Sequence, residues 1–207
     1  METILLASSS PRRRELLESL SIPFTVLSPD VDETAYDALE PEFRVGALAE
    51  AKALAVRDKL LRESLPRPRL MLAADTLVVL GEGTSLEVIG KPENLDEARS
   101  MLTRLQGRTH RVYSGLCLYD LRSEKRETVV ATTKVRFAPM KDKEIEEYLG
   151  WNEWQGAAGA YQIQGRASWY IKDIAGSWSC VVGLPIRELY GILSNAGYEF
   201  APAKGTK

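Results

Sequence analysis

Residues 4–17 read ILLASSSPRRRELL, and this stretch decides the fold because it joins a strand to a helix. The apolar run from Ile4 to Ala7 predicts a buried strand, three serines end it, and Pro11 suits the first position of a helix. The free N–H groups at that helix start and the arginines beside them favour a polyanion. The same residues also suit a serine-capped helix with a solvated arginine face, so this stretch alone leaves both interpretations open.

Size and composition narrow the class of protein. With 207 residues, 44% of them hydrophobic, the chain can bury a core, and we expect one domain over residues 1–200 with a C-terminal tail over 201–207. A net charge of −2 argues against a general nucleic-acid coat, so the cluster Arg12 to Arg14 favours a small anionic ligand. The apolar runs are too short for a signal sequence or a membrane span, which predicts a cytoplasmic protein without a membrane partner.

Histidine and cysteine content restricts the chemistry. The single histidine, His110, excludes metal sites built from several histidines and leaves it as the one possible base of a hydrolytic triad. Cys117 and Cys180 each lie in an apolar stretch, which is typical of reduced core cysteines.

Beyond the opening stretch, the pattern predicts further strands and helices. Strands are expected over residues 24–27, 70–80, 87–89, 111–121, 127–137, 170–174 and 179–182, and helices over 41–61, from Asn94 or Asp96 to 105, over 141–149 and over 185–195. A turn is expected at 81–84, and the glycine-rich segment 156–165 is expected to be a loop.

A carboxylate in the middle of an apolar run is the strongest functional signal. Asp75 lies at the centre of residues 70–80, LMLAADTLVVL. Burial of an unpaired carboxylate costs several kcal/mol or forces protonation, so Asp75 must meet a cation, a metal or a cleft. The alternative is a turn aspartate between two shorter strands, because an Asp-Thr pair can also break a strand.

Lys52 falls on the apolar stripe of the predicted helix 41–61, four residues from both Leu48 and Val56. A lysine there either extends its ammonium to solvent or directs it at a buried anion. The acidic turn from Asp30 to Thr34 contains Glu33, and a cluster of this kind is more often a plain solvated loop than part of a site. The cations at 12–14, 52 and 91 and the carboxylates of Glu33 and Asp75 together favour magnesium or manganese and phosphoryl chemistry on an ester or anhydride.

Short motifs along residues 4–195 resemble the Maf family in their order. They are LASSSPRR at 6–13, DET at 32–34, LA at 48–49 with Lys52, ADT at 74–76, GKP at 90–92, GAY at 159–161 with QG at 164–165, and VGLP at 182–185. The resemblance implies an α/β fold: a two-lobed, Maf-like (anticodon-binding/ITPase-like) domain with a mixed, strongly twisted sheet, flanking helices and a central cleft, often as a homodimer. It also implies a nucleoside triphosphate pyrophosphatase, which releases pyrophosphate and a nucleoside monophosphate.

Roles for individual residues follow from the resemblance. It implies that Asp75 is the proton acceptor and that Glu33, Lys52 and Lys91 surround a divalent metal (Mg²⁺ or Mn²⁺) and the triphosphate, with Glu33 and Asp75 as the metal ligands. On the same reading we expect Ser8, Ser10 and the helix start to hold phosphate oxygens, with Arg13 supplying charge.

The resemblance also implies a substrate. Arg12, Thr76 and Gln164 match the branch of the family that prefers dTTP and UTP, whereas the sister branch prefers 7-methyl-GTP. CTP, which we expect to be hydrolysed less well, and modified pyrimidine triphosphates are the further candidate substrates. One departure is visible, because Ala157 stands where many relatives carry a lysine. Two alternatives stay open: a 7-methyl-GTP pyrophosphatase, and a regulator of septum formation that binds nucleotide or nucleic acid without turnover. For the enzyme we expect no stable nucleic-acid partner.

Overall fold

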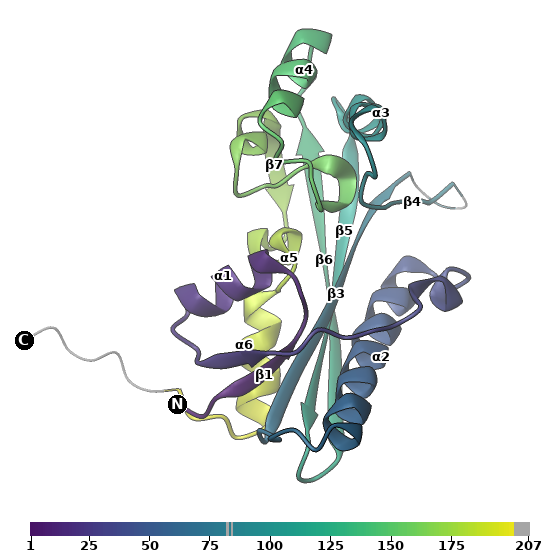
Figure 1. The fold of residues 1–207 in the computed structure, drawn as a ribbon. Helices are drawn as coiled ribbons and strands as arrows, with labels where there is room; N and C mark the ends of the chain where they lie inside the picture. Colours follow the sequence, from purple (N-terminus) through teal and green to yellow (C-terminus); the bar gives the residue numbers. More distant parts are fainter. Residues whose placement is uncertain (82, 84, 201–207) are drawn as a thin grey trace, which may run out of the picture.

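The computed structural model describes residues 1–81, 83 and 85–200. The predicted tail over 201–207 lies outside the described residues, as do positions 82 and 84 of the predicted turn. Within the described part, seven strands form one sheet in the order β2-β1-β3-β5-β6-β7, with β4 paired to β3 (Figure 1). The strands are β1 (Ile4–Ala7), β2 (Phe24–Val26), β3 (Leu70–Leu80), β4 (Glu87–Ile89), β5 (Thr109–Asp120), β6 (Lys125–Phe137) and β7 (Ile171–Ala175).

Helices cover both faces of this sheet (Figure 1). The α-helices are α1 (Pro11–Ser19), α2 (Pro41–Arg62), α3 (Leu95–Leu105), α4 (Asp142–Gly150), α5 (Trp178–Val182) and α6 (Ile186–Asn195). Short 3-10 helices are η1 (Glu33–Tyr36), η2 (Ala158–Ala160) and η3 (Arg166–Tyr170). None of the helices among the described residues has the length and apolar character needed to cross a membrane.

The sheet is mixed, and its direction changes at β3. Strand β1 pairs in parallel with β2 and β3, whereas β3, β5, β6 and β7 pair antiparallel with one another in that order. Strands β3, β5 and β6 are 11, 12 and 13 residues long and run through both the lower lobe (β1, β2, α1, α2 and α6) and the upper lobe (α3, α4, β7, η2 and η3) in Figure 1. The expected α/β class with a mixed sheet is confirmed.

Alternate residues of β1 face opposite sides of the sheet, which explains why this short run is apolar throughout. Leu5 and Ala7 join the core under α2, while Ile4 and Leu6 join the larger core on the other face. Their partners include Ala49, Ala53 and Val56 of α2 on the first face, and Leu17 of α1 with Leu189 and Leu193 of α6 on the second.

Gly115 in β5 lets α2 lie unusually close to the sheet. A Cβ atom on Gly115 would stand 2.4 Å from the carbonyl oxygen of Val45 and 2.9 Å from the backbone nitrogen of Gly46. Gly115 is also the register partner of Asp75 in β3. Because directly paired residues point to the same face of a sheet, Asp75 faces α2 at the point of closest approach.

Aromatic side chains fill the upper lobe. Phe137 of β6 meets Tyr161 edge to face, with ring centroids 5.1 Å apart. His110 of β5 bonds the Tyr161 hydroxyl through Nε2 at 2.8 Å, and burial lowers the pKa of His110 to about 4. His110 therefore stays neutral in the core rather than serving as a catalytic base.

One predicted element is wrong. Residues 179–182, expected to be a closing strand, belong to helix α5, which ends at Gly183 with a φ of 115°. The five residues of α5, which are apolar except for Ser179, fit helix and strand periodicity equally well, and the turn on each side decides between them. The other open choice at an element end is also settled, because the Asn94 side chain accepts from the backbone N–H of Glu97 at 3.0 Å and so caps α3.

Candidate active site

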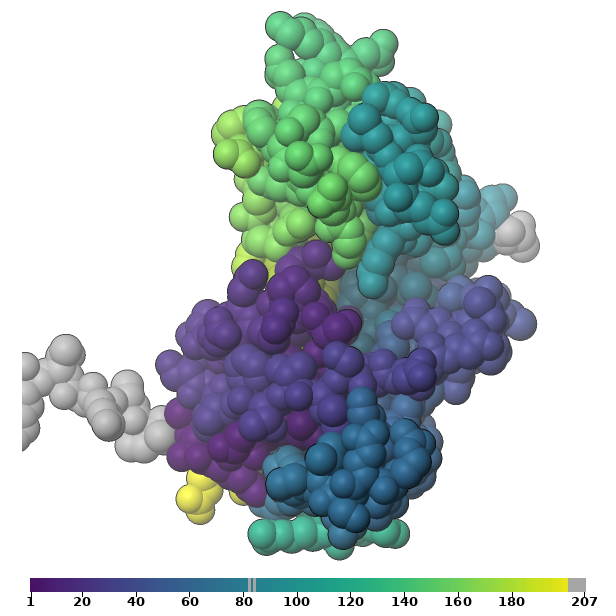
Figure 2. Space-filling model, in the orientation of Figure 1, coloured from purple at the N-terminus to yellow at the C-terminus, as the bar shows by residue number. Residues whose placement is uncertain are grey.

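A cleft of about 440 Å³ separates the two lobes near the middle of β3. Figure 2 shows its two sides, with the purple N-terminal segments below and the green segments above. Every residue that the sequence marks as part of a site lines this cleft: Ser8, Ser10, Arg12, Arg13, Glu33, Lys52, Asp75, Thr76, Lys91 and Gln164. Positions as far apart in the sequence as Ser8 and Gln164 are thus brought to one place.

Asp75 lies inside one continuous strand, so the alternative of a turn aspartate is wrong. Its side chain is 8% exposed, and its Oδ1 lies 2.6 Å from the Nζ of Lys52. Its other oxygen, Oδ2, is buried and has no hydrogen-bond partner among the residues that the structure describes. The carboxylate is therefore neutralised on one side and free to accept a proton or a cation on the other.

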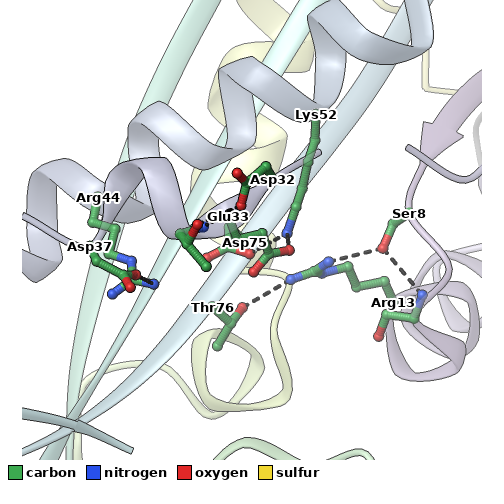
Figure 3. Close-up of polar contacts among 11 residues, drawn as sticks. Ser8, Arg13, Asp32, Glu33, Asp37, Arg44, Lys52, Asp75 and Thr76 are labelled. Atoms are coloured by element: carbon green, nitrogen blue, oxygen red, sulfur yellow. Dashed lines mark hydrogen bonds and ion pairs between the residues drawn. The ribbon is translucent and has the colours of Figure 1, made fainter. Parts of the chain in front are cut away.

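Lys52 directs its ammonium at buried acid rather than at solvent. Besides Asp75, its Nζ lies 2.7 Å from Oε1 of Glu33, and Figure 3 shows the lysine descending from α2 to both carboxylates. Burial acts to raise the pKa of Glu33, but the hydrogen bond and charge of Lys52, with the charges of Lys91 and Arg44, outweigh it and hold that pKa below its usual range. The cations around the cleft thus favour the charged form of Glu33.

Arg13 is buried and ties three parts of the chain together; Figure 3 shows its contacts with Ser8 and Thr76. Its Nε donates to the carbonyl oxygen of Gly183 at 2.8 Å, its Nη1 to Ser8 Oγ at 2.9 Å and its Nη2 to Thr76 Oγ1 at 3.1 Å. Burial lowers the pKa of Arg13 and the charge of Asp75 opposes that effect, but an arginine stays charged in either case. This guanidinium places a fixed positive charge beside Asp75.

The other residues of the first loop divide between the cleft and the surface. Ser10 occupies the cap position of α1 without a side-chain capping bond, and its backbone N–H donates to Ser8 Oγ at 3.2 Å. Arg12 donates from Nη2 to the carbonyl oxygen of Gly156 at 3.1 Å, whereas Arg14 is exposed. A serine-capped helix with a solvated arginine face is therefore the wrong interpretation of this stretch for Arg12 and Arg13.

Gln164 and Lys91 stand at the rim of the cleft, and both are exposed. Gln164 donates from Nε2 to Oε1 of Gln162 at 3.1 Å, and Gln162 in turn donates to the backbone carbonyl of Glu153 at 2.7 Å. Ala157 is buried. The glycine-rich segment is thus anchored by its own polar side chains.

Sequence reasoning missed three cleft-associated residues. Arg44 and Gln162 line the cleft, and Ser114 lies directly behind Thr76, with its Oγ 2.9 Å from Thr76 Oγ1 and no exposed surface. Ser114 is one of several polar residues in β5 and belongs to none of the short motifs, so no motif in the sequence identifies it. Only the pairing of β5 with β3 places it opposite Thr76.

The carboxylates suit a divalent cation shared with a ligand rather than a closed metal site. The described residues contain no group of three or more His, Cys, Asp or Glu side chains arranged to hold a metal ion. Magnesium, however, is commonly held by one or two carboxylates together with phosphate oxygens and water. The unpartnered Oδ2 of Asp75 and the half-exposed carboxylate of Glu33 fit that arrangement.

Comparison with known proteins identifies relatives along nearly the whole chain. Residues 3–196 match the family described as Maf-like protein. The dTTP/UTP pyrophosphatase of Treponema denticola is 41% identical over 202 residues, covering 96% of this chain and 98% of the relative. The protein of the same name from Myxococcus xanthus is 43% identical over 195 residues, covering 94% and 92%. Among solved structures, the Staphylococcus aureus Ham1 protein matches weakly, with a TM-score of 0.44 and 15% identity over 68% of this chain and 74% of that one.

Proposed function

The chain belongs to the Maf family, and from that membership we propose that it hydrolyses dTTP and UTP to the nucleoside monophosphate and pyrophosphate. One observation carries the proposal at the level of chemistry. A buried carboxylate, Asp75, has one oxygen paired to Lys52 and the other unpartnered, inside a cleft lined by cations. This arrangement suits a general base that works on an anionic substrate.

Asp75 would act as the proton acceptor. Water attacks the α-phosphorus, the bond from that phosphorus to the bridging oxygen breaks, and pyrophosphate leaves. The proton lost by the water passes to Oδ2 of Asp75, while Lys52 holds Oδ1 and fixes the direction of the carboxylate. The reaction consumes one water and needs no redox partner.

The N-terminal loop and the rim would bind the phosphates. Ser8, Ser10 and the N–H groups at the start of α1 offer donors to phosphate oxygens. Arg13 donates three of its five N–H groups to protein acceptors, and its positive charge stays beside the phosphates. Lys91 at the exposed rim would supply a positive charge for the departing pyrophosphate.

Glu33 would hold Mg²⁺ or Mn²⁺ together with phosphate oxygens. Asp75 would be the second metal ligand in the alternative arrangement, in which its Oδ2 binds the metal instead of taking the proton of the water. When bound, the metal would neutralise charge that develops on the phosphates. Arg12, Thr76 and Gln164 are proposed to surround the base, and a cytoplasmic homodimer completes the proposal. Light scattering on the purified protein measures the oligomeric state.

Incubation with dTTP or UTP and magnesium, with separate detection of pyrophosphate and orthophosphate, tests this function. We expect pyrophosphate and the nucleoside monophosphate as products. Preference for 7-methyl-GTP over dTTP at equal concentration would move the chain to the sister branch. Binding of nucleotide without product would favour a regulator, provided that the same preparation gives a cooperative melting curve.

A further inference from the structure

The hydroxyl groups behind Arg13 form a chain of hydrogen bonds whose direction is fixed. Ser114 Oγ, which has no exposed surface, donates to the carbonyl oxygen of Cys180 at 2.8 Å. A carbonyl oxygen only accepts, and a serine hydroxyl carries a single proton. Ser114 has therefore no proton left for Thr76, and the 2.9 Å contact between the two hydroxyls must be donated by Thr76.

The direction of this chain determines what Thr76 can offer to a ligand. Its proton goes to Ser114, and one of its two lone pairs receives the Nη2–H of Arg13 at 3.1 Å. One lone pair remains, on a residue that lines the cleft and is half-buried. Toward the cleft, Thr76 is thus an acceptor and not a donor.

We infer that Ser114 is a positioning residue that fixes Thr76 as an acceptor, and that this acceptor selects the imide N3–H of uracil and thymine against cytosine. The inference rests on the proposed function, because it takes the base of the nucleotide to lie against Thr76. The imide edge carries an N–H between two carbonyl oxygens, whereas cytosine has a bare nitrogen lone pair at the same position. Two acceptors that face each other leave both groups unpaired.

The packing around Ser114 allows one substitution to change the direction of the Thr76 hydroxyl without disturbing its neighbours. The carbonyl oxygen of Cys180 also accepts the backbone N–H of Gly183 at 3.1 Å, so loss of the Ser114 hydroxyl leaves that oxygen with a donor. Ser114→Ala then removes the acceptor of the Thr76 proton and leaves Arg13 and Thr76 in place. Freed from Ser114, the Thr76 hydroxyl can turn its proton toward the cleft and donate it to N3 of cytosine.

Four proteins test the inference: the wild type, Ser114→Ala, Thr76→Val and the double variant. For each, kcat/KM is measured with UTP and with CTP, and the binding of UMP and CMP is measured by calorimetry. We expect the wild type to favour the uracil nucleotide by about tenfold or more, and Ser114→Ala to reduce that ratio about tenfold, the scale of one hydrogen bond. In the Thr76→Val background, Ser114→Ala should leave the ratio unchanged, since its effect passes through Thr76.

Thr133→Val is the matched control. Thr133 is as fully buried as Ser114, and its hydroxyl bonds the backbone of Ser177 just before α5, donating to the carbonyl oxygen at 3.1 Å and accepting from the N–H at 3.0 Å. Its removal should lower stability and leave the ratio of uracil to cytosine unchanged. Comparison of Thr133→Val with Ser114→Ala therefore separates the general effect of losing a buried hydroxyl from the specific effect of freeing the Thr76 proton.

Equal weakening of both nucleotides by Ser114→Ala, or an unchanged ratio, would overturn the inference and make Ser114 a packing residue. If the wild type releases no pyrophosphate from any triphosphate, the proposed function fails, and the UMP and CMP affinities still decide the role of Ser114. Should Ser114→Ala not fold, Ser114→Cys replaces it, because a thiol is of similar shape and a poor acceptor.

Discussion

At the scale of single residues, Asp75 uses its two oxygens for different purposes, and this predicts a specific phenotype. Asp75→Asn keeps the size and hydrogen-bonding reach of the side chain but removes its charge and basicity. We expect turnover of UTP to fall at least about a hundredfold, the usual scale for loss of an acid–base group, with UMP binding largely retained. Pyrophosphate release and calorimetry measure the two quantities.

Asp120→Asn provides the control for that change. Asp120 lies at the far end of β5, where it pairs with Arg69 at 2.9 Å. Its substitution changes the same functional group in the same sheet outside the cleft, so activity should stay close to that of the wild type. Normal turnover in a folded Asp75→Asn protein would refute the role of proton acceptor.

The two cleft lysines should respond differently to replacement by methionine. Lys52 is bonded to both carboxylates and its side chain is 12% exposed, so Lys52→Met leaves Asp75 buried and unpaired and should cost about 3 kcal/mol of stability. Lys91 is exposed at the rim, so Lys91→Met should leave the melting temperature nearly unchanged.

Nucleotide binding tests whether the two lysines contact the terminal phosphates. If Lys91 meets the β- and γ-phosphates, Lys91→Met should weaken dTTP far more than dTMP. We expect the same preference for Lys52→Met, added to its loss of stability. Equal loss for dTTP and dTMP in the Lys91 variant would show that this lysine does not contact the terminal phosphates.

Individual site residues were predictable from the sequence where a local rule applies. A lone carboxylate in an apolar strand identifies Asp75, and helical spacing places Lys52 on the buried face of α2. The partners of Arg13 were not predictable, because Thr76 and Gly183 lie 63 and 170 residues further along the chain. A guanidinium expected to meet phosphate alone proves to organise the protein groups around it as well.

At the scale of elements, the close approach of α2 to β5 sets the distance between Lys52 and Asp75. Gly115→Ala would place a Cβ 2.4 Å from the carbonyl oxygen of Val45, so α2 must move outward and carry Lys52 with it. We expect a loss of about 2 kcal/mol in unfolding free energy and a reduced turnover in the protein that still folds. Chemical denaturation and pyrophosphate release measure both effects.

Gly46→Ala is the matched control on the opposite side of the same contact. Its Cβ would meet Thr128 Cγ2 and Val130 Cγ2 at 3.5 Å, an ordinary van der Waals distance. Because alanine favours a helix interior over glycine by about 1 kcal/mol, this variant should be as stable as the wild type or more so. A Gly115→Ala protein as stable and active as Gly46→Ala would show that α2 does not need this close contact.

The elements that the sequence predicted well are long and strongly patterned. Strands β3, β5 and β6 and helix α2 differ from expectation only at their ends. The error at α5 arises because the run is short, largely buried and followed by a glycine. In so short a run the hydrophobic pattern fits a helix and a strand equally well. Its helical form matters for the site, since the turn that follows it presents the carbonyl oxygen of Gly183 to Arg13.

At the scale of the whole molecule, the buried His110 couples stability to pH. Its folded pKa, about 4, lies below the ordinary value of 6.5. Between these two pH values His110 is protonated in the unfolded chain and neutral in the folded protein. The stabilisation is complete above pH 6.5 and is lost as pH falls toward 4. Between pH 7 and pH 5 this residue alone should account for about 2 kcal/mol of lost stability.

Denaturation of the wild type and His110→Gln at pH 7 and pH 5 measures that contribution. The glutamine amide can still pair with the Tyr161 hydroxyl but does not titrate, so the variant should lose about 2 kcal/mol less than the wild type over this interval. The carboxylates whose pKa values are lowered titrate mainly below pH 5, which keeps their effect out of the comparison. Identical losses in both proteins would exclude His110 as the source.

The hydrogen bond from Arg13 to Gly183 also fixes when the protein becomes active during its synthesis. The two residues are 170 positions apart, and at roughly 5–20 residues per second a ribosome needs roughly 10 to 30 seconds to cover that distance. Lys52 and Asp75 are made in the first half of this interval, yet until it ends Arg13 lacks its acceptor and Thr76 lacks the segment behind Ser114. We expect nucleotides in the cell to meet a competent cleft only after the last helices have emerged, so that a nascent chain stalled before α5 hydrolyses none of them.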